Sequence, residues 1–125
     1  MKFIQTDKAP KAVGPYSQAV VVDSFVYCSG QIGLDPVTNT LVFGIEKQTE
    51  QVLKNLNHVL TQAGTDKTHV VKTTIFVINI SDFATVNQIY EDFFGEHKPA
   101  RATVEVSNLP KGALVEIEAI AILKK

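Results

Sequence analysis

The chain has 125 residues, of which 45% are hydrophobic and 20% are charged, so it is long enough for one soluble domain with its own core. Its formal net charge is −1 and no basic cluster exceeds two adjacent residues, which leaves strong binding to a nucleic-acid backbone without an electrostatic basis. The single cysteine, Cys28, excludes an intrachain disulfide and a thiolate metal cluster, and without an apolar run long enough for a signal peptide or a membrane span the expected compartment is the cytoplasm.

The first third of the chain predicts a β-hairpin followed by an irregular stretch. Two β-prone runs, 18–23 and 25–29, are separated by Asp23 and Ser24, a pair that is typical of a tight turn. Residues that interrupt regular structure then recur at short intervals: Gly30, Gly33, Pro36 and Asn39.

The middle of the chain predicts a helix, a strand and a second helix. Apolar residues recur at intervals of three and four within 46–63, which is the spacing of one helix face. The segment 69–78 is rich in Val, Ile, Thr and Phe and predicts a strand. Ser81 or Asp82 can cap the second helix, which ends at Gly95.

The last third predicts two strands, 102–107 and 113–123, because Pro99 prevents the second helix from continuing. The segment 108–112 is rich in turn residues and would join these strands as a hairpin. The order of elements is therefore ββ(β)αβαββ, which predicts an α+β fold in a single domain over 1–125. We expect a mixed sheet of about six strands with two helices on one face.

The last predicted strand is apolar on both of its faces. Ile120 and Ile122 point one way, whereas Ala119, Ala121 and Leu123 point the other. Two helices cover only one face of the sheet, so the second apolar face needs a partner chain. The pattern predicts an oligomer and leaves the number of subunits open.

General motifs for catalysis, nucleotide binding and metal binding are absent from the sequence. His58, His69 and His97 are scattered without the spacing of metal ligands, and His58 is expected on a helix surface. Cys28 lies in an apolar strand, where a free cysteine is usually a small buried hydrophobe and not a nucleophile. No metal site is expected.

Charged residues that border or interrupt apolar strands are the first candidates for chemistry. Arg101 opens the apolar run 102–106, where a guanidinium could hold a carboxylate by two parallel hydrogen bonds; the alternative is a surface arginine paired with a glutamate. Glu116 and Glu118 share one face of the last strand. They are either solvated at the strand start or placed in a site, and one of them beside an arginine would suit acid/base catalysis.

Three polar features are weaker candidates when they are taken singly. Asn87 lies in the apolar stripe of the second helix and needs hydrogen-bond partners, although a structural role is the commoner explanation. The turn 14–18 is stiffened by proline and brings the hydroxyl of Tyr16 to a strand start. Ser29 and Gly30 end the hairpin, and a ligand could approach the backbone of the glycine closely.

Taken together, these features resemble the RidA/YjgF family, whose members are also labelled endoribonuclease L-PSP. The resemblance covers essentially the whole chain and rests on six segments in order: GPYSQ (14–18), SGQI (29–32), VKTTIFV (71–77), FATVN (83–87), PARATVEV (99–106) and LPKGALVEIEAIA (109–121). It implies a chorismate-mutase-like domain, a homotrimer with sites between subunits, and an enzyme of the 2-iminobutanoate/2-iminopropanoate deaminase class. Such enzymes hydrolyse reactive 2-imino acids to 2-keto acids and ammonia.

Carried over by position, the resemblance implies that Arg101 binds the substrate carboxylate and that Glu116 handles the water. The substrate-binding positions that it implies are Tyr16, Ser29, Gly30, Asn87 and Thr103. Many family members have a cysteine where this chain has Thr103, and a serine is common at Ala102. We expect Thr103 to serve through its backbone N–H and its size, since a thiol is not needed to hydrate an imine.

Several alternatives stay open at this point. The turn 108–112 does not settle the register of the predicted hairpin, so Arg101 and Glu116 could meet within one chain or across an interface. A metabolite-binding regulator without turnover is the alternative function; an RNA-acting endoribonuclease or translation inhibitor fits the charge balance less well. No metal or organic cofactor is expected, because an imine is already electrophilic. The preferred imino acid is not specified.

Overall fold

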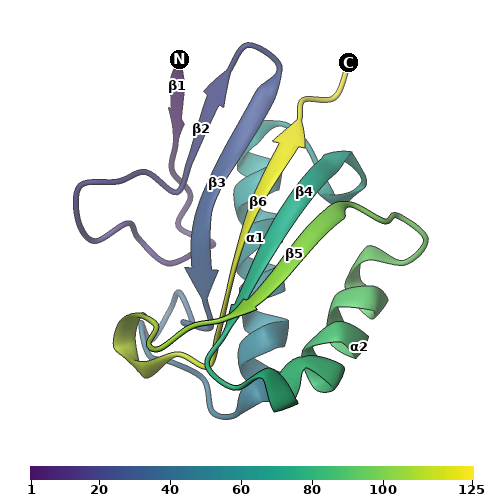
Figure 1. Ribbon diagram of the computed structural model, residues 1–125. Helices are drawn as coiled ribbons and strands as arrows, with labels where there is room; N and C mark the ends of the chain where they lie inside the picture. Colours follow the sequence, from purple (N-terminus) through teal and green to yellow (C-terminus); the bar gives the residue numbers. More distant parts are fainter.

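The computed structural model describes residues 1–125 as a six-stranded mixed sheet with two helices on one of its faces (Figure 1). The strands are β1 (Lys2–Ile4), β2 (Ala19–Val22), β3 (Phe25–Ile32), β4 (Val70–Val77), β5 (Ala100–Glu105) and β6 (Val115–Ile122). The helices are α1 (Ile45–Ala63) and α2 (Phe83–Phe94), and single 3₁₀ turns are formed by Lys67–His69, Ile80–Asp82 and Pro110–Gly112. The predicted α+β class, the strand number and both helices are confirmed; the short β1 was not predicted.

The strand order is β1-β2-β3-β6-β4-β5, and it contradicts one prediction. β5 and β6 do not form a hairpin, because β6 lies between β3 and β4 and is antiparallel to both. β5 instead pairs in parallel with β4 at the edge of the sheet. The reason is that α2 carries the chain back along the face of the sheet, so that β5 runs in the direction of β4. The more apolar β6 then takes the central position.

Alternate residues of β6 explain why the helices lie on one face only. Val115, Ile117, Ala119 and Ala121 are buried, and they belong to the core formed with α1 and α2. The apolar positions of α1 pack against this side, where Val52 and Leu53 are almost fully buried. Burying each such side chain stabilises the fold by about 1.5–3 kcal/mol. Neither helix has the length and apolar character that a membrane span requires.

The opposite face of the sheet is also apolar, as the sequence predicted, and no element of the chain covers it. Ile120 and Ile122 of β6 lie there beside their partners in β3, Tyr27 and Phe25, which are 46% and 42% exposed. Val104 at the far edge is 42% exposed. We refer to this surface, from Phe3 in β1 to Val104 in β5, as the helix-free face.

Candidate active site

Four of the predicted site residues line one hollow at the end of the helix-free face: Tyr16, Ser29, Gly30 and Glu116. The hollow has a volume of about 720 Å³ and is bounded by the loop before β2, the end of β3, the start of β6 and the turn before β6. Glu118 and the lysines Lys11 and Lys111 also line it. The structure therefore brings together residues that are up to 100 positions apart in the sequence.

Gly30 lies directly against the Glu116 side chain in this hollow. A Cβ at position 30 would come within 2.9 Å of Glu116 Cδ and closer still to Oε2, so any other residue would displace the carboxylate. A break in the pairing of β3 with β6 between Cys28 and Gln31 gives the backbone this course. Within the chain the group that approaches Gly30 is the Glu116 carboxylate, and the approach of a ligand to this glycine stays a prediction.

The electrostatics of Glu116 favour its protonated form more than those of an ordinary surface carboxylate. Burial, and then the negative charge of Glu118, raise the pKa of Glu116 above its usual value. Glu118 lies two residues further along β6 on the same face and is exposed. Neither a hydrogen bond nor a cation offsets these two effects. A half-buried carboxyl with a raised pKa holds a proton more readily than an ordinary surface carboxylate, which suits it to take up and return a proton during a reaction.

A buried amide that the sequence did not single out, Gln18, holds the wall of the hollow that carries Tyr16. Its Oε1 accepts from the N–H of Thr6 at 2.8 Å, and its Nε2 donates to the carbonyls of Thr6 and Pro10 at 3.1 and 2.8 Å. The hydroxyl of Ser29 donates to the carbonyl of Ser17 at 2.6 Å. Tyr16 itself is 53% exposed. The position of Gln18 at the end of the turn 14–18 was the available signal, but no pattern distinguished it from a surface glutamine.

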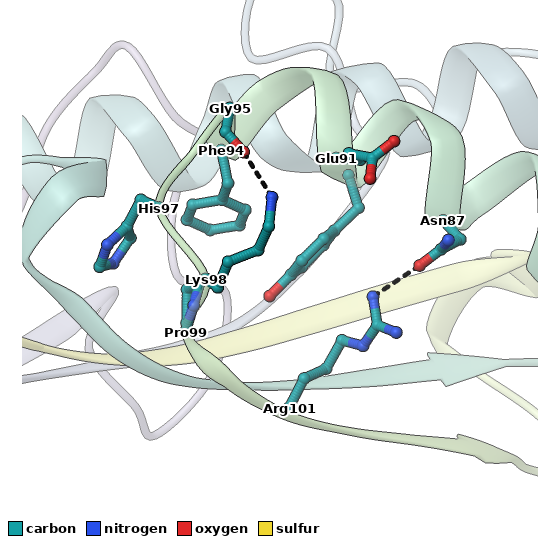
Figure 2. Close-up of a pocket in the computed structure, with 9 residues that line it drawn as sticks. Asn87, Glu91, Phe94, Gly95, His97, Lys98, Pro99 and Arg101 are labelled. Carbon is teal, nitrogen blue, oxygen red and sulfur yellow. Dashed lines mark hydrogen bonds between the residues drawn. The ribbon is translucent and has the colours of Figure 1, made fainter.

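Arg101 lies in a second pocket, between β5 and α2, on the helix-covered face. Its Nη1 donates to Oδ1 of Asn87 at 2.7 Å, as Figure 2 shows. The pocket has a volume of about 350 Å³, and Tyr90, Glu91 and Lys98 also line it. None of the ion pairs of the chain involves Arg101, so the alternative of a surface arginine paired with a glutamate does not hold. Asn87 has the hydrogen-bond partner that its place in the helix requires.

Arg101 and Glu116 do not meet within one chain. Arg101 is paired with Thr73 of β4, whose hydroxyl contacts α2, and therefore points toward the helices. Glu116 is paired with Phe76, which in turn is paired with Val104 of β5. Directly paired residues share a face, and side chains alternate along a strand. Val104 is three positions from Arg101, so the guanidinium and the carboxylate lie on opposite faces of the sheet.

Thr103 shares the face of Arg101, two positions further along β5. Its Oγ1 is buried and has no hydrogen-bond partner within the chain. Cys28 is 6% exposed, and burial raises the pKa of its thiol to about 12. A thiol that is buried and protonated at neutral pH is not a nucleophile, as predicted.

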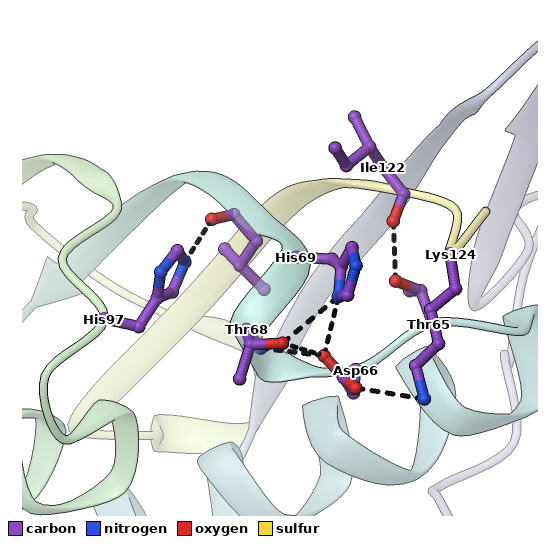
Figure 3. Close-up of polar contacts among 8 residues, drawn as sticks. Thr65, Asp66, Thr68, His69, His97, Ile122 and Lys124 are labelled. Atoms are coloured by element: carbon purple, nitrogen blue, oxygen red, sulfur yellow. Dashed lines mark hydrogen bonds and ion pairs between the residues drawn. The ribbon is translucent and has the colours of Figure 1, made fainter.

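His69 and His97 make local polar contacts, and neither lines the hollow (Figure 3). The carboxylate of Asp66 accepts from the backbone N–H of Thr68 at 2.9 Å and contacts His69 Nδ1 at 2.9 Å and Lys124 Nζ at 3.0 Å. The hydroxyl of Thr68 also donates to this carboxylate, at 2.6 Å. That hydrogen bond first, and then the contacts with His69 and Lys124, hold the pKa of Asp66 well below its usual value. His97 Nε2 donates to the carbonyl of Val70 at 2.7 Å. The chain has no group of three or more side chains that could hold a metal ion.

The chain has the fold of small α+β proteins of the Rid type, as its match to solved structures of that type shows. The family model for endoribonuclease L-PSP matches residues 6–123, and the chain belongs to this family, which is the RidA/YjgF family. Human 2-iminobutanoate/2-iminopropanoate deaminase is 52% identical over 97% of this chain and 89% of its own length. RidA from an Antarctic Psychrobacter has a TM-score of 0.96, is 47% identical, and is matched over 98% of this chain and all of its own. E. coli TdcF with bound serine has a TM-score of 0.95, is 39% identical, and is matched over 99% and 100%.

Proposed function

We propose that this protein hydrolyses reactive 2-imino acids, as a 2-iminobutanoate/2-iminopropanoate deaminase that releases 2-keto acids and ammonia. The observation that carries the proposal is the identity of 52% with the human deaminase across 97% of the chain. The site supports it independently, because it offers a guanidinium for a carboxylate and a carboxyl with a raised pKa for proton transfer. The E. coli relative contains bound serine, a small amino acid with the same carboxylate as a 2-imino acid.

The active form is a homotrimer in which each site lies between two subunits. The support for this is that Arg101 and Glu116 lie on opposite faces of one chain, so that only a neighbour can bring them together. The exposed aromatic and aliphatic side chains of the helix-free face, such as Phe25 and Tyr27, would be buried in the assembly. Interfaces of permanent homo-oligomers bury about 2,000 Å² or more and are apolar. A monomeric mass in solution at micromolar concentration would contradict this assembly.

In the proposed reaction Arg101 binds the substrate carboxylate and so fixes the imine carbon. Glu116 of the neighbouring subunit takes a proton from a water molecule while the water oxygen bonds to that carbon, and it passes this proton to the imine nitrogen, which gives the carbinolamine. Glu116 then takes the proton of the carbinolamine hydroxyl and returns it to the amino group. The C–N bond breaks, ammonia leaves and the 2-keto acid remains. Backbone groups of Gly30 and Thr103 orient the imine and the water, and Tyr16 forms the wall of the pocket.

Turnover is tested with imines made in the assay from several amino acids by an amino-acid oxidase, with the disappearance of the imine followed in time. The deaminase should shorten the lifetime of the imine at catalytic concentrations of protein. Stoichiometric binding without turnover would favour a metabolite-binding regulator instead.

The shared site is tested by mixing two inactive variants, Arg101→Ala and Glu116→Gln, and allowing subunits to exchange or refold together. Random mixing gives about a quarter of the interfaces an intact arginine facing an intact glutamate, so about a quarter of wild-type activity should return. A site that one chain forms alone would give no recovery, and the assignment of the site to the subunit interface would be withdrawn.

A further inference from the structure

Three side chains on one face of α2 contact the guanidinium of Arg101. They are Phe83, Asn87 and Tyr90, which are spaced by four and three residues and therefore lie one above another on the helix. Asn87 accepts the hydrogen bond from Nη1. The ring centroids of Phe83 and Tyr90 lie 5.2 and 5.0 Å from Cζ of Arg101. Both distances are within the range of a cation–π interaction.

Both aromatic rings lie about 5 Å from the guanidinium carbon. Phe83 and Tyr90 are seven residues apart, which is a rise of about 10.5 Å along the helix, so the guanidinium contacts two successive turns of α2. Asn87, which lies between Phe83 and Tyr90 in the sequence, accepts a hydrogen bond from one of the five N–H donors of the guanidinium. The remaining donors of the guanidinium have no hydrogen-bond partner within the chain and are left for an anion.

Tyr90 is fixed more firmly than the arginine that it contacts. It is 6% exposed, its hydroxyl and that of Thr73 are joined by a hydrogen bond of 2.7 Å, and its ring packs on Phe94 with centroids 4.7 Å apart. Thr73 is the residue of β4 that is paired with Arg101. Thr73 thus contacts the Tyr90 hydroxyl through its side chain and lies opposite the backbone of Arg101 in the sheet. Arg101 itself is on the exposed edge strand β5.

We propose that Phe83 and Tyr90 are positioning residues that hold the Arg101 guanidinium in one orientation, with Asn87 on one side and its free donors toward the substrate carboxylate. This rests on the proposed function only for the identity of the carboxylate. A long arginine on an exposed strand would otherwise lose many rotamers when it binds an anion. Holding the side chain in place before binding removes that cost and increases affinity.

The test measures binding of 2-oxobutanoate, the keto acid with the same carboxylate, by calorimetry on the assembled protein. Phe83→Leu and Tyr90→Leu should each weaken binding by about 3- to 30-fold, whereas Tyr90→Phe, which keeps the ring, should stay within about threefold of wild type. Phe93→Leu is the matched control, since the ring of Phe93 on the same helix contacts Lys67 and not Arg101. It should bind like the wild type.

A double-mutant cycle separates positioning from a general structural effect. In an Arg101→Ala background, Phe83→Leu should cause no further loss of binding, because the rings act only through the guanidinium. An equal loss in both backgrounds, or wild-type binding by a folded Phe83→Leu variant, would overturn the proposal. Because keto-acid binding requires no turnover, a protein that lacks deaminase activity but shows these losses would contradict the proposed function and leave the positioning role intact.

Discussion

The two faces of the sheet carry different halves of the proposed chemistry and are built differently. On the helix-covered face, Arg101 is contacted by Asn87 and by two aromatic rings, all within one chain. On the helix-free face, Glu116 lies in an open hollow against Gly30, with a pKa raised by burial and by Glu118 and not lowered by any cation. Arg101, which would bind the substrate carboxylate, already has its contacts within the chain. The charge of Glu116, which would transfer the proton, is not stabilised by a hydrogen bond or a cation, and this favours proton exchange.

The largest expected effect comes from the proton-transferring half. Glu116→Gln keeps the size of the side chain but cannot exchange a proton, so kcat for 2-iminobutanoate should fall by about 10²- to 10⁴-fold. Binding of 2-oxobutanoate should change little, because Arg101 is intact. Steady-state kinetics and calorimetry on the same preparation measure both. A variant with kcat near that of the wild type would remove Glu116 from the mechanism.

The second-largest effect is expected from a change at Arg101, which would bind the substrate carboxylate. Arg101→Lys keeps the charge but replaces a planar guanidinium by a compact ammonium. The ammonium cannot make two parallel hydrogen bonds to a carboxylate, and it cannot contact the rings of Phe83 and Tyr90 as the guanidinium does. The loss should be about 2–4 kcal/mol, or roughly 30- to 1,000-fold in kcat/KM. Thermal unfolding should stay near that of the wild type, since Arg101 is exposed and not part of the core. Near-normal turnover by a folded variant would withdraw the assignment of Arg101.

A smaller effect tests how the helix-free face adjusts Glu116. The negative charge of Glu118 helps to raise the pKa of Glu116. Glu118→Gln removes that charge, so the pKa of Glu116 should fall and the acid limb of the profile of kcat/KM against pH should move to lower pH. Glu50→Gln, an exposed change on α1, is the control and should leave the profile unmoved. An acid limb that does not move, or moves to higher pH, would contradict the coupling of the two carboxyls.

The smallest effect concerns Thr103, which lies beside Arg101 on the helix-covered face. Thr103→Cys should change kcat/KM only by a few-fold, because its assigned role is that of the backbone and of side-chain size and no thiol takes part in the proposed reaction. The measurement is the kcat/KM ratio of the variant and the wild type on the same imine. A gain of several hundredfold would mean that the thiol of other family members matters and that this chain is a weakened enzyme.

Local pattern predicted most of the fold. The apolar spacing within 46–63 and the β-branched run within 69–78 identified α1 and β4, because helix and strand periodicity are properties of consecutive residues. The same reasoning predicted the uncovered apolar face, because the last strand is apolar on both sides and two helices cover only one face of the sheet. The family was also within reach, since six short segments in order are a property of the chain and need no coordinates.

Only the tertiary structure decided how those residues are distributed. The turn before β6 looked like a hairpin turn, yet the crossover through α2 placed β5 at the edge and β6 in the centre. That topology put Arg101 and Glu116 on opposite faces, a result that depends on pairings between distant strands. It also turned Phe83 and Tyr90, which the sequence marks only as apolar helix residues, toward the guanidinium. Sequence spacing determines which side chains share a face of one element, but the packing of elements determines which faces meet.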